Sequence, residues 1–330
     1  MRDDPPERAD DPAGTLVGSV SLQLYTFSDV TGPITADGTA VTVALTTPGQ
    51  RGVFTFNGTA GQIVSATITA ISPSTFPNSW TLAVVGPTGS TVASGIGCCA
   101  NVVGFVDAVS LPSTSAYTVV VDPGSTLIGT VAVRLYTVVH VTGPIITDGT
   151  AVTVSLSTPG QNAYLTFNGT QGQRVSLNAT NGTIQFEEAG CDVWVDIRTA
   201  SNTEVSGSQT CMEGSGFMER VTLPATGVYT VVVNPTLDAV GNLTLSLYDV
   251  PPDVAGSLSI NGDGLPVTIT APGQNGRITF PAPPPSMVFG GAIPDLYFRS
   301  FLLDLASRLA EWNKPTPKVE ISYCIQGLDC

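Results

Sequence analysis

Charged residues and histidine are scarce in this 330-residue sequence. Asp, Glu, Lys and Arg make up 12% of it, and 26 acidic residues against 12 basic ones give a net charge of −14. A surface of this charge repels the phosphate backbone, so we expect no nucleic-acid binding, and anionic membranes are disfavoured for the same reason. The simplest interpretation is that the charge keeps the protein soluble.

Long apolar runs are also missing. No stretch of about 18 apolar residues is present, so we expect no membrane span. Residues 1–10 are polar, charged and Pro-rich, which predicts a disordered N-terminus. Since this start has no apolar core of a signal peptide, either export is signalled elsewhere or the N-terminal part of a longer protein is missing.

The single histidine, His140, lies in the segment VVHVTGP. A catalytic triad would need an activated Ser and an orienting carboxylate beside it, and a zinc site would need Cys partners at close spacing. The sequence places no cysteine near His140 and contains no CxxC pair. We therefore interpret His140 as a solvent-facing linker residue and expect no enzyme activity.

What the sequence does contain is a repeat. Residues 148–173 read DGTAVTVSLSTPGQNAYLTFNGTQGQ, and residues 37–62 read DGTAVTVALTTPGQRGVFTFNGTAGQ. A third copy, GDGLPVTITAPGQNGRITF, begins at Gly262 and breaks off after Phe280. The copies are in register at spacings of 111 and 113 residues. Such spacings match a common domain size, which predicts repeated domains.

Runs with alternating apolar and polar residues fill both complete copies, and turn sequences such as TPGQ and NGT separate them. This period of two predicts short strands with one face in a core. We expect an all-β fold of tandem antiparallel β-sandwich domains of jelly-roll-like type. The expected strands are 41–46, 52–57, 63–70, 80–85, 105–111, 117–121 and 131–136 in the first copy, and 151–157, 163–168, 174–180, 192–199, 217–223, 229–233 and 243–248 in the second.

The predicted domains are residues 28–139 for repeat 1, 140–250 for repeat 2 and 251–280 for a partial repeat 3, with the Pro-containing linkers as boundaries. Residues 11–27 match the last strand of each repeat, so they are interpreted as the terminal strand of a truncated preceding repeat. Residues 281–330 form a divergent Pro-rich tail in which 293–312 has the spacing of an amphipathic helix. That helix either covers the broken repeat or belongs to a frame-shifted tail.

These motifs resemble the bacterial pre-peptidase C-terminal (PPC) domain. The similarity covers residues 11–280. It rests on two Gly-Gln turns around an aromatic strand, Gly160-Gln161 and Gly172-Gln173, and on a closing pair that contains Gly227-Val228-Tyr229 and residues 243–247. The resemblance implies a non-catalytic accessory module of a large secreted or surface protein that serves secretion, adhesion or substrate contact. No catalytic domain accompanies the modules in this sequence.

The six cysteines fall into three groups. Cys191 opens one expected strand and Cys211 follows the next, so a hairpin would join them in a disulfide, which requires an oxidising compartment. Cys98 aligns with Cys211, but Asn78 stands where its partner would be. The pairing of Cys98, Cys99, Cys324 and Cys330 stays open.

Two possible sites follow repeat 2's second Gly-Gln turn. Glu187, Glu188 and Asp192 supply hard oxygen ligands, so calcium is a possible cofactor; a solvated acidic loop is the alternative.

In VWVDIR, Val193, Val195 and Ile197 alternate with Trp194, Asp196 and Arg198. If the first set is buried, the second faces water and forms a ligand-binding surface for a protein or carbohydrate. Cover by a loop or neighbouring domain is the alternative for Trp194.

We therefore expect a non-catalytic extracellular or cell-surface segment that acts as a spacer, adhesion or ligand-contact module. One alternative is an accessory segment of a secreted hydrolase whose catalytic domain lies outside this chain. Another is a self-assembling filament or surface-layer subunit, because residues 17–25 and the incomplete sheet at 258–280 are complementary parts of one fold.

Overall fold

The computed structural model describes residues 19, 21–72, 80–97, 104–124, 126–185, 190–259, 263–282 and 319–325. These segments contain strands and turns and no helix. The expected helix at 293–312 lies outside them, as do residues 1–18. Within the described ranges, no helix is long and apolar enough to cross a membrane.

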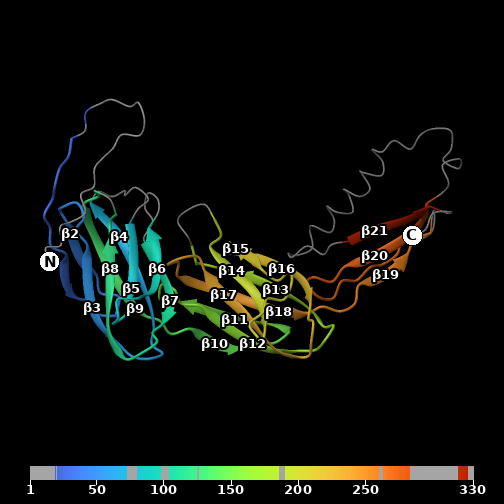
Figure 1. Cartoon of the computed structure of the whole chain (residues 1–330). Coiled ribbons are helices and arrows are strands. Elements are labelled where there is room, and N and C mark those ends of the chain that lie inside the picture. Colours follow the sequence, from blue (N-terminus) through green and yellow to red (C-terminus); the bar gives the residue numbers. More distant parts are fainter. Residues whose placement is uncertain are drawn as a thin grey trace, which may run out of the picture.

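The first repeat, here called unit 1, consists of two sheets (Figure 1). A buried apolar cluster lies between them. Their strand orders are β1-β3-β8-β5-β6 and β2-β9-β4-β7. The strands are β1 (Val30–Pro33), β2 (Val41–Leu45), β3 (Gly52–Gly58), β4 (Ile63–Ser72), β5 (Trp80–Val85), β6 (Thr91–Gly97), β7 (Gly104–Ser110), β8 (Ser115–Asp122) and β9 (Gly129–Thr137).

The second repeat, unit 2, has the same arrangement around its own buried cluster, with strand orders β10-β12-β17-β14-β15 and β11-β18-β13-β16. Its strands are β10 (Val141–Pro144), β11 (Asp148–Leu156), β12 (Ala163–Gly169), β13 (Arg174–Thr180), β14 (Val193–Thr199), β15 (Thr210–Met212), β16 (Gly216–Thr222), β17 (Gly227–Pro235) and β18 (Gly241–Asp249).

A buried tyrosine closes the core of each complete unit. Tyr229 is 2% exposed and stacks on Phe167 at a centroid distance of 5.6 Å. Its hydroxyl donates to the Ala225 carbonyl at 2.7 Å and accepts from the Ala225 N–H at 3.1 Å. Tyr117 in unit 1 makes the same stack, on Phe56. The hydroxyl therefore satisfies the turn before β17, and the ring fills the core.

Unit 3, which is the third repeat together with residues 319–325, differs from the other two. Its sheet has the order β19 (Val254–Ser257), β20 (Gly276–Ala282) and β21 (Val319–Ile325), and both pairings are parallel. β21 thus lies where the antiparallel strands β8 and β17 lie in the complete units. Residues 263–270, which align with β2 and β11, form no strand.

Successive units dock through one repeated contact. The Ser65 hydroxyl of unit 1 donates to the Pro159 carbonyl of unit 2 at 2.6 Å, and Ser176 of unit 2 donates to Pro272 of unit 3 at 2.7 Å. Both serines are fully buried. In each case the carbonyl belongs to the PGQ turn of the following unit, so this turn is a docking element as well as a bend.

The glutamine of the same turn ties each unit to the segment that leads into it. The Oε1 atoms of Gln50, Gln161 and Gln274 accept the N–H of the residue four positions earlier, at 2.7–2.9 Å. Their Nε2 atoms donate, at 2.6–2.8 Å, to main-chain carbonyls in the entering segments, which belong to Ser28, Val139 and Pro252. The same glutamine contact therefore fixes the entry of each of the three units.

The predicted fold class, tandem antiparallel β-sandwich domains separated by linkers, is wrong as a description of this molecule. β1 and β10 pair in parallel with β3 and β12, which makes the five-stranded sheets mixed. The segments expected as linkers contain these strands. Because the units also dock directly and follow one another in a row (Figure 1), the all-β chain is a solenoid-like stack of repeats.

Residues 21–27, part of the expected terminal strand, form no strand. Leu22 and Leu24 are 79% and 94% exposed, whereas Phe27, at 50%, lies against Gly49 of unit 1. The expectation depended on strand neighbours like those of β9, and this segment has none within the described residues.

Candidate ligand-contact face of unit 2

Strand β14 carries the predicted binding residues and lies between β17 and β15. Val193, Val195 and Ile197 are buried in the core at 1% exposure or less. Trp194, Asp196 and Arg198 alternate with them and share the opposite, outer face of the sheet. The structure thus brings the three residues together on one strand.

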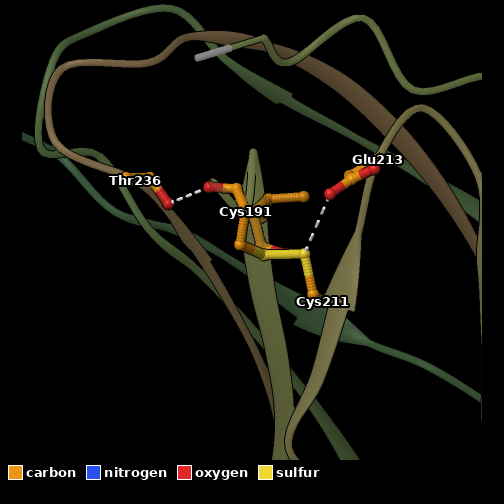
Figure 2. Close-up of a disulfide and its surroundings, with 5 residues drawn as sticks. Cys191, Cys211, Glu213 and Thr236 are labelled. Atoms are coloured by element: carbon orange, nitrogen blue, oxygen red, sulfur yellow. Dashed lines mark hydrogen bonds between the residues drawn. A yellow bond between two sulfur atoms is a disulfide. The ribbon is translucent and has the colours of Figure 1, made fainter. Parts of the chain in front are cut away.

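Trp194 lies open on this face, with 40% of its surface exposed. Its register partners are Cys211 on β15 and Asn234 on β17. Cys211 is bonded to Cys191, as expected from the sequence, with Cα atoms 5.6 Å apart (Figure 2). The Thr236 hydroxyl donates to the Cys191 carbonyl, so the segment before β14 is fixed at both β15 and the loop after β17.

Asp196 departs from the expectation that it faces water. Only 4% of the residue is exposed, because the Arg198 guanidinium binds it with two hydrogen bonds, Nε–Oδ1 at 2.8 Å and Nη2–Oδ2 at 2.9 Å. These bonds raise the pKa of Arg198. Arg198 Nη1 also donates to Asn202 Oδ1 at 3.3 Å. The pair is a fixed planar polar group, since both ends of the guanidinium are held.

The face continues onto neighbouring strands with residues that the sequence analysis missed. In register across the sheet, Asp196 lies opposite Val232 of β17, and Val232 lies opposite Tyr164 of β12. The Tyr164 and His140 rings pack edge to face, with their centroids 5.2 Å apart. The alternation in AYLTF, with Leu165 and Phe167 inward, would have identified Tyr164 as an outward residue.

Unit 1 has an equivalent five-stranded sheet, but different residues lie on its outer face. Thr81, Ala83 and Val85 of β5 stand where Trp194, Asp196 and Arg198 stand, and Val53 stands in place of Tyr164. The inward positions Trp80, Leu82 and Val84 are 2% exposed or less, as in unit 2. Large aromatic and charged side chains at these positions therefore belong to unit 2, while the core pattern is shared.

His140 occupies a structural position at the entry of unit 2. Its Nδ1 accepts the N–H of Asn162 at 3.1 Å. In unit 1 a carboxylate oxygen of Asp29 accepts the equivalent N–H, from Arg51, at 3.0 Å. Burial lowers the pKa of His140, and the charge of Asp107 opposes this. The ring therefore acts as a neutral acceptor where unit 1 uses a carboxylate.

The calcium prediction is only partly covered by the structure. Glu187 and Glu188 lie outside the described residues. Asp192 lies just before β14, and its carbonyl accepts the N–H of Thr236 at 3.0 Å. Among the residues that the structure describes, no group of three or more His, Cys, Asp or Glu side chains is placed to hold a metal ion.

An open groove of 590 Å³ lies where unit 2 meets the segment leading into unit 3. Nearby, Asp253 pairs with Arg220 and Arg174, the latter at 3.2 Å. Burial acts to raise the pKa of Asp253, but the two guanidinium groups hold it below its ordinary value. These charges join unit 2 to the entry of unit 3. The groove is lined by Asn168, Thr170, Gly172, Gln173, Arg174, Asp249, Val250, Pro251 and Pro252.

Comparison with known proteins gives weak likenesses. No family description and no curated protein matches the chain. Similar solved structures include the pre-peptidase C-terminal domain of a collagenase from Bacillus anthracis (TM-score 0.24, 16% identity, 32% of this chain and 93% of that one). Another is Aeromonas hydrophila PliG, a periplasmic inhibitor of g-type lysozyme (0.24, 14%, 33% and 98%). A third is the CUB1-EGF-CUB2 region of human MASP-1/3 (0.23, 7%, 63% and 99%). At these scores the likenesses carry no argument about fold or function.

Proposed function

We propose that this chain is a non-catalytic extracellular repeat array, in which unit 2 contacts a protein or carbohydrate partner and the stacked units act as a spacer. The observation that carries the proposal is the contrast between the outer faces of units 1 and 2. The shared core explains the fold of both, but it does not require Trp194, Tyr164 and the Asp196–Arg198 pair on one of them.

The chemistry of this face suits binding. A half-exposed indole offers a rigid apolar surface that stacks on a sugar ring or fills a protein pocket. Arg198 lies on the same strand and is already held by Asp196 and Asn202, so little side-chain freedom is lost when a partner binds. The Cys191–Cys211 bond anchors the segments on either side of Trp194.

The same disulfide supports an extracellular or periplasmic location. Disulfides persist in oxidising compartments and are rare in the cytosol. Cys191 and Cys211 join β15 to the segment before β14, so the bond is part of the proposed face.

Replacing Trp194 with Thr, the residue of unit 1, tests the proposal. Binding of the whole chain and of Trp194→Thr would be measured on an array of defined glycans and on immobilised chitin and cellulose. The control is Val228→Thr, which changes another exposed apolar residue of unit 2. We expect a carbohydrate bound by the parent and by Val228→Thr to be lost in Trp194→Thr, with unchanged unfolding temperature. Equal binding by all three proteins would refute the assignment of the face.

A further inference from the structure

We propose that residues 21–27 of one copy of this chain are inserted as a β-strand into unit 3 of a second copy, so that copies join head to tail. Residues 21–27 and unit 3 both lie outside the Trp194 face of unit 2, so this inference is independent of the ligand-binding proposal. It follows from an exposed segment with the sequence of a core strand and from unit 3, where the described residues place no strand at the corresponding position.

The donor segment reads SLQLYTF. It aligns with VRLYTV at the end of β9 and with LSLYDV at the end of β18. In β18 the two inward leucines, Leu245 and Leu247, are fully buried in the unit 2 core. Their counterparts Leu22 and Leu24 are 79% and 94% exposed. Because the same sequence pattern is buried in unit 2, the exposure of these two leucines indicates a surface that binds another protein segment.

The acceptor is residues 265–270 of unit 3. Among the described strands, their counterparts β2 and β11 each have one partner, β9 and β18 respectively. Without such a neighbour among the described residues, 265–270 form no strand. Leu265 is 37% exposed, and Val267 and Ile269 are half-buried, although their counterparts Val154 and Leu156 are 1% exposed.

The complete units specify the register of the proposed strand pair. Val152 lies opposite Leu245 and Ala151 lies opposite Ser246. Transferred by alignment, this places Leu22 opposite Leu265 on the core side and Gln23 opposite Gly264 on the outer side. Pro266 lacks an N–H, which is tolerated on an edge strand such as β2 or β11.

A second copy is the occupant because the two surfaces lie at opposite ends of the molecule, and unit 2 separates them (Figure 1). In the chain itself, β9 leads directly into unit 2 and β18 leads into unit 3. Residues 21–27 lead into unit 1 in the same way, and Gln50 holds the Ser28 carbonyl as Gln161 holds that of Val139. Insertion would therefore continue the stack, and such a heterologous contact adds copies without closure.

The first test measures self-association of the whole chain by sedimentation velocity at increasing concentration. We expect linear oligomers. The double variant Leu22→Asp and Leu24→Asp should weaken association at least about a hundredfold, since it places two charges in the core of the acceptor. Because both leucines are exposed in the single copy, the variant should keep its unfolding temperature. Val228→Asp is the matched control and should associate like the parent.

The second test is a cross-link in the inferred register. Gln23→Cys combined with Gly264→Cys should give a ladder of disulfide-linked oligomers, whereas each single variant gives none beyond the parent's background. A Cβ at Gly264 meets no atom within 4 Å, so the new side chain fits. Gln23→Cys with Thr268→Cys is the off-register control. A parent that stays monomeric, oligomers that persist in the double Asp variant, or equal cross-linking in both pairs would overturn the proposal.

Discussion

His140 joins the entry of unit 2 to the following turn by a hydrogen bond that requires a neutral ring. The Nδ1 atom accepts the Asn162 N–H at 3.1 Å, so the proton of the neutral imidazole belongs on Nε2. Protonation turns Nδ1 into a donor that faces another donor. Burial already lowers the pKa of His140. We therefore predict that acid weakens the native state at this residue.

Proton linkage gives the direction in which the free energy of unfolding changes with pH. Because the pKa of His140 is lower in the folded chain than its ordinary value of about 6.5, the folded state binds fewer protons. The contribution of this bond is complete above about pH 6.5 and is lost as the pH falls through the lowered pKa. One neutral hydrogen bond contributes about 1 kcal/mol to the free energy of unfolding, and this sets the size of the expected loss.

Two variants separate the hydrogen bond from other effects of acid. His140→Ala should lose about 1 kcal/mol at neutral pH and show no histidine-linked decline. His140→Asp offers the Asn162 N–H a carboxylate acceptor, as Asp29 does for the Arg51 N–H in unit 1, and should show no histidine-linked decline between about pH 7 and about pH 5. Urea denaturation at several pH values measures these differences.

A direct measurement is possible because the chain has one histidine. Nitrogen-15 NMR of the ring gives both its pKa and its tautomer without an assignment problem. We expect a pKa below about 6.5 and a proton on Nε2. A proton on Nδ1, or a pKa above the ordinary value, would refute the reasoning, since neither is compatible with an acceptor at this position.

Three further changes test other parts of the structure. Tyr229→Phe removes the hydroxyl that satisfies both the N–H and the carbonyl of Ala225, so urea denaturation should show a loss of about 1–3 kcal/mol. Gly160→Ala and Gly172→Ala both force a side chain into a left-handed backbone, which costs about 1 kcal/mol. Only the new methyl group at residue 160 also meets unit 1, so Gly160→Ala alone should change the small-angle scattering profile. Equal profiles for the two variants would contradict the docking role of the PGQ turn. Cys191→Ser opens a bridge with a sequence separation of 20 residues and should lower the free energy of unfolding by about 3 kcal/mol, measured against the parent with and without reductant; no difference would show that the bond does not form.

The strands of the complete units were largely predictable from alternation. The runs predicted at 52–57 and 163–168 are β3 and β12, because Phe56 and Phe167 fill equivalent core positions. The Cys191–Cys211 pair was also predictable, since the cysteines lie at matching ends of a hairpin. These features are local in sequence, and local patterns carry enough information to define them.

Non-local features were not predictable in this way. The VTGP segments are too short to show alternation, and only the exposed edge of β3 or β12 gives β1 and β10 a partner. The edge-to-face contact of the His140 and Tyr164 rings joins residues 24 positions apart. The contact between Ser65 and Pro159 joins residues 94 positions apart in different units. Each depends on tertiary neighbours, which override single-strand patterns.

The repeated contact between Ser176 and Pro272, and its equivalent between units 1 and 2, has an evolutionary consequence. A complete unit carries the acceptor carbonyl in its PGQ turn and the donor serine on its β4 or β13 strand. Duplication of the gene segment for one such unit therefore supplies both halves of a new joint at once. The array can lengthen by in-frame duplication without a compensating mutation, which leaves the outer face of each unit free to differ, as Thr81 of unit 1 and Trp194 of unit 2 do.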